Sequence, residues 1–378
     1  MKRHRHHEVV IAGGGPAGAA AAIVLARAGR DVLLVDAAAE GAFRVGEALP
    51  PAARPLLRDL GVLERVEADG HLRCHGNVSA WGDVALRGTD FLFGVNGAGW
   101  HVDRARFDAS LRVAARDVGA EVLGRARIGD VERAPGGGFA LRVVEGEEAL
   151  TLSCDALIDA TGRSSAVARR LGASRSQEDA LVAFFVRFRS RGEAMWGAST
   201  LADRDGRTLI EAERAGWWYS ARVPSGERVV AFLTDPDLAD RKVLLSEEGF
   251  GARVRETRAV QEVLARHGYV MGGRPRGIDA GSARLDRFGG EGWLAVGDAA
   301  LSFDPLSSQG MMNALYTGLR AGEALLAWRS GDGGGVARYL ARLEAIHAAY
   351  RENLALFYGQ ERRWVGGAFW QRRVRMSP

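Results

Sequence analysis

Residues 8–36 read EVVIAGGGPAGAAAAIVLARAGRDVLLVD, and the rest of the chain is organised around this stretch. The apolar run VVIA predicts a buried strand that ends in the glycine turn GGGPAG. The alanine-rich run over 19–28 has strong helix propensity, and the apolar run over 32–35 predicts a second strand that ends at Asp36. A strand, a glycine turn, a helix, a second strand and a terminal acid, in this order, predict a dinucleotide-binding unit.

Three glycines occupy the fixed positions of this turn, and each has a physical role. Gly13 permits the tight turn out of the strand, Gly15 leaves room for a pyrophosphate at the backbone, and Gly18 lets the helix pack closely on the strand. The helix N-terminus then offers unpaired N–H groups to the phosphates, and the Asp36 carboxylate can accept hydrogen bonds from both ribose hydroxyls. This pattern alone does not separate FAD from NAD.

The composition is that of an ordinary globular protein, since 47% of the 378 residues are hydrophobic and 26% are charged. No apolar run reaches the length of a membrane span. The basic leader over 1–7 lacks the apolar core of a secretory signal, so we expect a solvated N-terminal tail and a cytoplasmic protein. Cys74 and Cys154 lie far apart and form no metal motif or disulfide framework, so no metal site is expected.

The net charge of +4 does not indicate a nucleic-acid partner. The basic residues are scattered among 47 acidic ones, and no recognition motif accompanies them. We therefore expect a small-molecule or protein substrate.

A second distinctive stretch, GWLAVGDAALSFDPLSSQGMMNALYTG, spans residues 292–318. Its first strand ends at Asp298, whose carboxylate can accept hydrogen bonds from ribityl or ribose hydroxyls. Pro305 interrupts the chain, and 307–310 leads into a helix that begins near Met311. The N-terminus of that helix is suited to the electron-rich edge of a flavin ring. The alternative is an ordinary Pro/Ser turn before a helix.

Together these motifs resemble the FAD-dependent monooxygenase and halogenase superfamily, which has a glutathione-reductase-type FAD fold. The resemblance rests on GGGPAG, the acid at Asp36, Arg104 opening a helix, DATG at 159–162 and GD…DPLSSQG at 297–310, and it covers nearly the whole chain. It implies that FAD is the cofactor and that Ile128 lies near the adenine. The residues expected to bind FAD are Gly13, Gly15, Pro16, Ala17, Gly18, Asp36, Arg104, Ile128, Asp298, Pro305, Gly310 and Met311.

The resemblance implies an α/β fold in which a Rossmann-like FAD-binding domain (three-layer ββα) is interleaved with a β-sheet-rich substrate domain, followed by a helical C-terminus. The predicted segments are 1–60, 101–175 and 276–330 for the discontinuous FAD-binding domain, 61–100 and 176–275 for the substrate domain, and 331–378 for the C-terminal helices.

Within this superfamily, three stretches are similar to small tryptophan-halogenase-like flavoproteins. They are GEALPP at 46–51, GWWYSARVP at 216–224 and ERRWVGGAFWQRR at 361–373. This group includes flavoproteins that mature quinone-cofactor amino-acid oxidases by hydroxylating a tryptophan of a partner protein.

Departures from the family patterns limit the reaction. Thr161 stands where single-component aromatic hydroxylases carry an aspartate that helps nicotinamide-driven reduction. The absence of this aspartate counts against direct reduction by NAD(P)H, and the reducing equivalents are expected from NAD(P)H either directly or through a separate flavin reductase. Tryptophan halogenases need a lysine near the flavin, and Lys2 and Lys242 are the only lysines of this chain. Tyr219 and Ala221 also replace both tryptophans of the halogenase WxWxIP signature, so halogenation is not expected.

The expected function is that of a monooxygenase hydroxylating an aromatic, tryptophan-like substrate, free or protein-borne, through a flavin C4a-hydroperoxide. The alternatives are a hydroxylase of a small or carrier-tethered metabolite, a geranylgeranyl-reductase-like enzyme acting on double bonds, and a non-catalytic dinucleotide-binding protein. The expected catalytic residues are Glu47, as an acid or base in a loop that faces the ring in this superfamily, and Trp218, as a ring that stacks on the substrate. Their structural alternatives are a solvated carboxylate and core packing.

Overall fold

The computed structural model describes residues 5–38, 44–91, 94–190 and 202–374. The dinucleotide-binding stretch folds as predicted, as strand β1 (Arg5–Ala12), helix α1 (Pro16–Arg27) and strand β2 (Val32–Asp36). The expected solvated tail is wrong over residues 5–7, because β1 already begins at Arg5. His7 is buried in this strand, and its Nδ1 atom lies 3.0 Å from Oδ1 of Asp31.

The first sheet surrounds β1 with parallel neighbours. Its order is β20-β21-β11-β1-β2-β8, with β20 (Gly289–Gly290), β21 (Trp293–Ala295), β11 (Glu148–Asp159) and β8 (Glu121–Gly124). Ile11 pairs with Ile158 on one side and with Leu34 on the other. The antiparallel strands β9 (Ala126–Arg133) and β10 (Phe139–Glu145) extend from β11. The glycine turn therefore lies at the carboxyl end of a central strand, where ligands of open α/β sheets bind.

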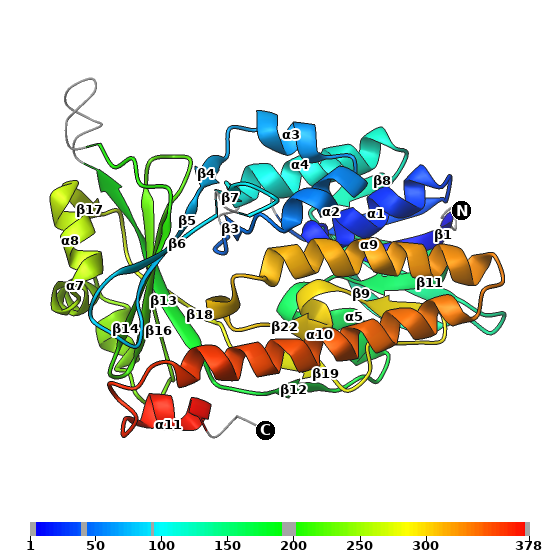
Figure 1. The fold of residues 1–378 in the computed structure, drawn as a ribbon. Helices are drawn as coiled ribbons and strands as arrows, with labels where there is room; N and C mark the ends of the chain where they lie inside the picture. Colours follow the sequence, from blue (N-terminus) through cyan, green and yellow to red (C-terminus); the bar gives the residue numbers. More distant parts are fainter. Residues whose placement is uncertain (1–4, 39–43, 92–93, 191–201, 375–378) are drawn as a thin grey trace.

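Two long helices connect this sheet to the rest of the molecule. α9 (Gly310–Arg329) packs against α1, and a Cβ atom at Gly318 would lie 2.1 Å from the Ala17 carbonyl oxygen. α10 (Gly334–Gly359) runs beside α9 and continues to the second sheet, as Figure 1 shows. α4 (Arg104–Asp117) packs on α1.

The second sheet has the order β17-β13-β16-β15-β14-β5-β6, with β18 beside β13. These strands are β17 (Tyr269–Met271), β13 (Val182–Ser190), β16 (Arg228–Thr234), β15 (Gly216–Arg222), β14 (Thr208–Glu213), β5 (Gly76–Ala80), β6 (Arg87–Asp90) and β18 (Arg276–Asp279). α7 (Glu247–Glu256) and α8 (Ala259–Arg266) contribute side chains to the core on one face. Phe185 and Leu233 lie in the core on the other face.

A small third sheet of β3 (Ala48–Leu49), β7 (Gly99–His101) and β4 (Leu72–Cys74) lies between the two halves. The short helices α2 (Ala53–Asp59) and α3 (Leu63–Ala68) join β3 to β4. This sheet contains residues from both sides of the predicted domain boundary at 60. The domain boundaries therefore stay predictions.

The remaining elements are short, and the C-terminus is helical as predicted. They are α5 (Ala166–Arg170), β12 (Arg175–Gln177), α6 (Arg241–Leu244), β19 (Ala283–Leu285), β22 (Leu301–Ser302) and α11 (Ala368–Val374). Phe369 and Trp370 of α11 are buried, and Trp370 Nε1 donates to the Glu213 carbonyl oxygen of β14. Among the described helices, none is long and apolar enough to cross a membrane.

Candidate cofactor and substrate site

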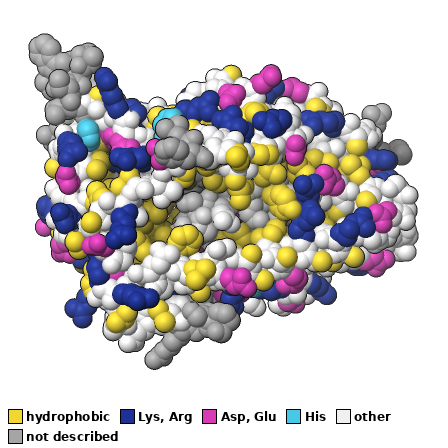
Figure 2. Space-filling model, in the orientation of Figure 1, with side chains coloured by type: hydrophobic (Ala, Val, Ile, Leu, Met, Phe, Trp, Pro, Cys, Tyr) yellow, Lys and Arg dark blue, Asp and Glu magenta, His cyan; other side chains and the backbone are white. Residues whose placement is uncertain are grey.

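One cavity of about 860 Å³ extends from the glycine turn after β1 to the inner face of the second sheet. Figure 2 shows a hollow bordered by hydrophobic side chains between the two halves of the molecule. All residues predicted to bind FAD line this cavity except Gly18. The lining members are Gly13, Gly15, Pro16, Ala17, Asp36, Arg104, Ile128, Asp298, Pro305, Gly310 and Met311.

The glycine turn has the steric properties that a phosphate cradle needs. Gly13 has a φ of +110°, and a Cβ atom there would lie 2.1 Å from the Ala160 carbonyl oxygen. A Cβ atom at Gly18 would lie 1.9 Å from the Gly13 carbonyl oxygen, so Gly18 permits packing within the turn and does not reach the cavity. At Gly15 a Cβ atom would meet only Nη1 of Arg44, at 3.8 Å. The N-terminus of α1 is therefore open to an anionic group.

Asp36 lies at the end of β2 and is held by α4. Nη1 of Arg112 lies 3.3 Å from the Asp36 carboxylate and donates to the Gly14 carbonyl oxygen at 3.1 Å. Arg104, Asp108 and Arg112 recur at intervals of four residues and share one face of α4. Of these three residues only Arg104 was predicted from the sequence, although the regular spacing could have indicated the other two.

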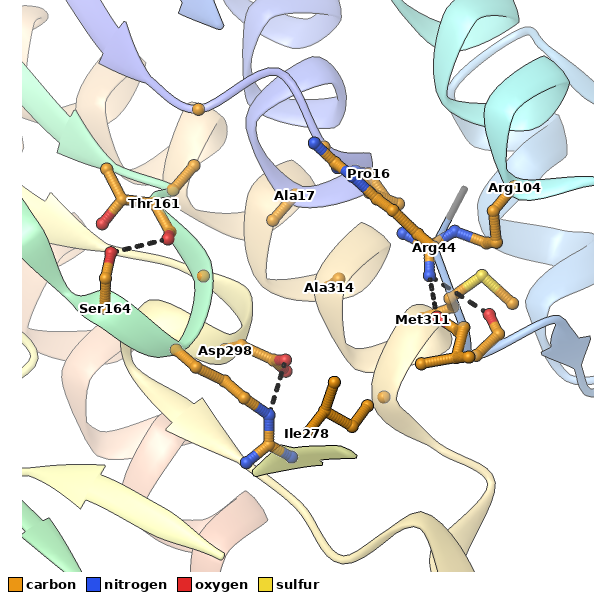
Figure 3. Close-up of a pocket in the computed structure, with 18 of the residues that line it drawn as sticks. Pro16, Ala17, Arg44, Arg104, Thr161, Ser164, Ile278, Asp298, Met311 and Ala314 are labelled. Atoms are coloured by element: carbon orange, nitrogen blue, oxygen red, sulfur yellow. Dashed lines mark hydrogen bonds and ion pairs between the residues drawn. The ribbon is translucent and has the colours of Figure 1, made fainter. Parts of the chain in front are cut away.

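Arg104 holds the backbone that immediately precedes β3. Its Nη1 atom donates to the carbonyl oxygens of Val45 and Gly46 at 3.0 and 3.2 Å. Asp108 is shared by the two arginines, with Oδ1 3.2 Å from Nε of Arg104 and Oδ2 3.1 Å from Nη1 of Arg44. Figure 3 shows Arg44 and Arg104 close together beside Pro16. The loop that carries Glu47 is therefore fixed by α4.

The start of α9 and Asp298 form another part of the cavity wall, next to the N-terminus of α1. Met311 and Ala314 of α9 face the same space as Ala17 of α1 in Figure 3. The Asp298 side chain is 39% exposed and lines the cavity. Its carboxylate lies 3.8 Å from Nε of Arg163. Burial by the surrounding protein raises the pKa of Asp298 despite this exposure. The N-termini of α1 and α9 thus open into one cavity, which fits an elongated dinucleotide.

Comparison with known proteins agrees with this geometry. Residues 6–342 match the family model described as "FAD binding domain". The chain belongs to this family of FAD-binding proteins. FAD is therefore the dinucleotide that this protein binds.

This FAD-binding protein is similar to flavoproteins that are named for different reactions. It is 29% identical to LodB of Marinomonas mediterranea, a proposed FAD-dependent oxidoreductase, over 80% of this chain and 79% of LodB. The solved structure of CmlS, a flavin-dependent halogenase, is 25% identical with a TM-score of 0.84 and covers 98% of this chain and 68% of CmlS. The peptidyl tryptophan dihydroxylase QhpG, essential for tryptophylquinone cofactor biogenesis, is 25% identical with a TM-score of 0.76 and covers 98% of this chain and 79% of QhpG.

Glu47 lines the same cavity and is 3% exposed. The Gly46 N–H donates to its Oε2 at 3.0 Å, whereas Oε1 makes no hydrogen bond of ordinary geometry to the described residues. Burial raises the pKa of Glu47, and the nearby Tyr219 hydroxyl, backbone N–H groups and Arg104 partly oppose this effect. Tyr219 of β15 also lines the cavity, and burial raises its pKa well above the usual range.

Trp218 does not lie in this cavity, which corrects the expectation that it stacks on a substrate. It is fully buried on the other face of β15, stacked on Phe232 and in edge contact with Phe250 of α7. Neighbouring side chains of a strand point to opposite faces, and it is Tyr219 that faces the cavity.

Thr161 also lines the cavity, but its hydroxyl is engaged in the fold. Its Oγ1 donates to Oδ1 of Asp159 at 2.6 Å and accepts from the Ala166 N–H at 2.7 Å. This residue therefore stabilises the turn between β11 and α5.

Proposed function

We propose that this FAD-binding protein is a monooxygenase that hydroxylates an aromatic, tryptophan-like ring, either free or carried on another protein. The observation that carries the proposal is that one continuous cavity joins the glycine turn to an apolar chamber, with Glu47 and Tyr219 at its wall. Bound FAD would supply the oxidation of the substrate with O₂, and the protein would bind, orient and exclude water.

Different residues of the cavity would hold the pyrophosphate, the ribose and the flavin of FAD. The N-terminus of α1 with Gly15 would bind the pyrophosphate, and Asp36 would accept a hydrogen bond from a ribose hydroxyl. Asp298 and the N-terminus of α9 would hold the flavin end.

The chamber beyond the cofactor region is suited to an aromatic ring. Its wall on the second sheet includes Phe185, Val229 and Leu233 with the small residues Ala183 and Ala231. Such a wall excludes water and leaves space for a planar ring.

Glu47 would act as the base or hydrogen-bond acceptor for the substrate. Its Oε1 is buried and has no ordinary hydrogen-bond partner among the described residues, so a substrate N–H or a ring proton could bind there. Because burial raises its pKa, the carboxylate is also better matched to accept a proton near neutral pH than a solvated glutamate.

The similarity to QhpG, a peptidyl tryptophan dihydroxylase, supports a tryptophan-like, protein-borne substrate as the first class to test. Hydroxylation is favoured over halogenation, the reaction for which CmlS is named. Tryptophan halogenases need a lysine near the flavin, whereas Lys242, the only lysine among the described residues, lies on α6 and does not line the cavity. The electrons would come from NAD(P)H, directly or through a separate flavin reductase.

The test is a product analysis with ¹⁸O₂. FAD-loaded protein is supplied with NADPH, with and without a flavin reductase, and with free tryptophan, a tryptophan-containing peptide or a simple phenol. We expect one labelled oxygen in an aromatic product. A chlorinated product in the presence of chloride, or reduction of an isoprenoid double bond without O₂, would overturn the proposal.

A Glu47→Gln variant tests the role of the carboxylate. We expect product formation to fall about a hundredfold or more while FAD stays bound, because general base catalysis typically contributes this much. In the wild type the rate should fall as the pH falls through the raised pKa of Glu47, and this acidic limb should be absent from the variant. The matched control is Glu213→Gln, since Glu213 is another carboxylate with a raised pKa but lies outside the cavity.

A further inference from the structure

Helix α10 reaches the loop that precedes α9 through Tyr358. The Tyr358 side chain is 1% exposed, and its hydroxyl donates to Oδ2 of Asp304 at 2.7 Å. Oδ1 of the same carboxylate accepts the Leu306 N–H at 2.8 Å. The Asp304 carboxylate therefore ties α10 to the short turn Pro305–Ser307.

A second tyrosine of α10 holds the backbone of the same aspartate. The Asp304 N–H donates to the Tyr350 hydroxyl at 2.9 Å, and that hydroxyl lies 2.5 Å from Ser282 Oγ. The Tyr350 ring also stacks on Phe303, with 4.3 Å between ring centroids. Two hydroxyls of one helix thus fix both the side chain and the backbone of Asp304.

Tyr358 is itself held from the second sheet and the C-terminus. Trp217 Nε1 of β15 donates to its hydroxyl at 3.1 Å. The Arg373 guanidinium of α11 lies 5.2 Å from the Tyr358 ring centroid and pairs with the buried Asp235 at 2.7 Å. The position of Asp304 therefore depends on the second sheet and on α11 as well as on α10.

Asp304 and Pro305 line the cavity, and the loop continues to Gly310, where α9 begins. We propose that Tyr358 is a positioning residue for FAD, which acts through Asp304 to place the 305–310 loop and the N-terminus of α9. This role is independent of the reaction that the enzyme catalyses, because it concerns how the cofactor is held.

The pKa of Asp304 provides a measurement that separates a positioning role of Tyr358 from a purely structural one. Burial and the charge of Asp179 raise the pKa of Asp304 to about 6, while the Leu306 N–H, Arg373 and Tyr358 lower it. The other side chain that faces it is Tyr350, whose hydroxyl has its own pKa raised by burial and by Asp304. Asp304 therefore changes charge near pH 6 beside the cofactor loop, and loss of the Tyr358 hydroxyl would move this change to higher pH.

The test compares Tyr358→Phe with Tyr339→Phe. Tyr339 is the matched control, because it is a buried tyrosine of the same helix whose hydroxyl donates to the Ala295 carbonyl oxygen at 2.6 Å instead of to the loop. FAD affinity is measured by fluorescence titration, and the visible absorption of bound FAD is followed across the pH range around 6. For Tyr358→Phe we expect FAD to bind about tenfold more weakly and the pH midpoint of the absorption change to rise. Tyr339→Phe should match the wild type in both measurements.

Equal FAD affinities and pH midpoints in the two variants would overturn the proposal. The same holds if Tyr358→Phe only lowers the melting temperature. If Tyr358→Phe does not fold, Asp304→Asn takes its place. The absorption change near pH 6 should then disappear, and its persistence would overturn the proposal.

Discussion

Gly15 and Gly18 belong to the same turn but differ in what surrounds them. A side chain at Gly15 would enter the cavity, whereas a side chain at Gly18 would collide with the Gly13 carbonyl oxygen at 1.9 Å. At the scale of single residues, one glycine leaves space for a ligand and the other allows the chain to pack.

We therefore expect opposite results from the same substitution at these positions. Gly15→Val should fold with a melting temperature close to that of the wild type but lose FAD affinity by about tenfold or more, because the side chain occupies the phosphate approach. Gly18→Val should fail to fold or melt far below the wild type. Thermal melting and FAD titration measure both effects, and normal FAD binding by Gly15→Val would contradict the assignment of the cradle.

Strand β15 packs into the hydrophobic core with one face and lines the cavity with the other. Trp218 and Tyr219 are neighbours in the sequence, yet Trp218 packs under α7 while Tyr219 faces the cavity beside Glu47. The alternation follows from strand geometry, but which face meets the cavity depends on what each face packs against.

Substitutions on this strand should separate stability from binding. Trp218→Ala should lower the free energy of unfolding by about 3–5 kcal/mol, the usual cost of removing a fully buried large aromatic side chain. Tyr219→Phe keeps the ring and should leave stability nearly unchanged but weaken substrate binding, because the hydroxyl beside Glu47 is lost. Urea unfolding and substrate titration distinguish the two. A large loss of stability in Tyr219→Phe, without a binding defect, would contradict the assignment of the two faces.

At the scale of the whole molecule, His101 joins the small sheet to the second sheet. It is fully buried on β7, where Nδ1 lies 2.9 Å from the Arg222 carbonyl oxygen and Nε2 lies 2.9 Å from Oγ1 of Thr208. Burial lowers the pKa of His101 to about 4. The folded protein therefore favours the neutral imidazole.

This shift predicts a pH dependence of stability. The unfolded chain binds a proton at His101 near pH 6.5, whereas the folded chain does so only near pH 4. The contribution of His101 to the free energy of unfolding is fully present above pH 6.5. It falls by up to about 3 kcal/mol as the pH decreases towards 4. Urea unfolding at several pH values should show a flatter profile for His101→Gln than for the wild type in this range. Parallel profiles would contradict the assignment.

The parts of the fold and site that could be predicted are those in which neighbouring residues carry the whole pattern. The β1–α1–β2 unit and the start of α9 follow from local propensity, turn chemistry and helix ends. Arg112 and Asp108 were missed although their spacing from Arg104 along α4 is regular. The prediction for Trp218 was wrong because alternation along a strand does not say which face is inward.

From the sequence alone follow the prediction of a dinucleotide site at the glycine turn and the second helix N-terminus nearly three hundred residues later. Local backbone geometry is sufficient for both conclusions. Only the tertiary structure decided that Tyr219 instead of Trp218 faces the cavity, that α4 holds the Glu47 loop, and that Tyr358 holds Asp304. These contacts join residues far apart in the chain, and packing between the two sheets and α10 brings them together.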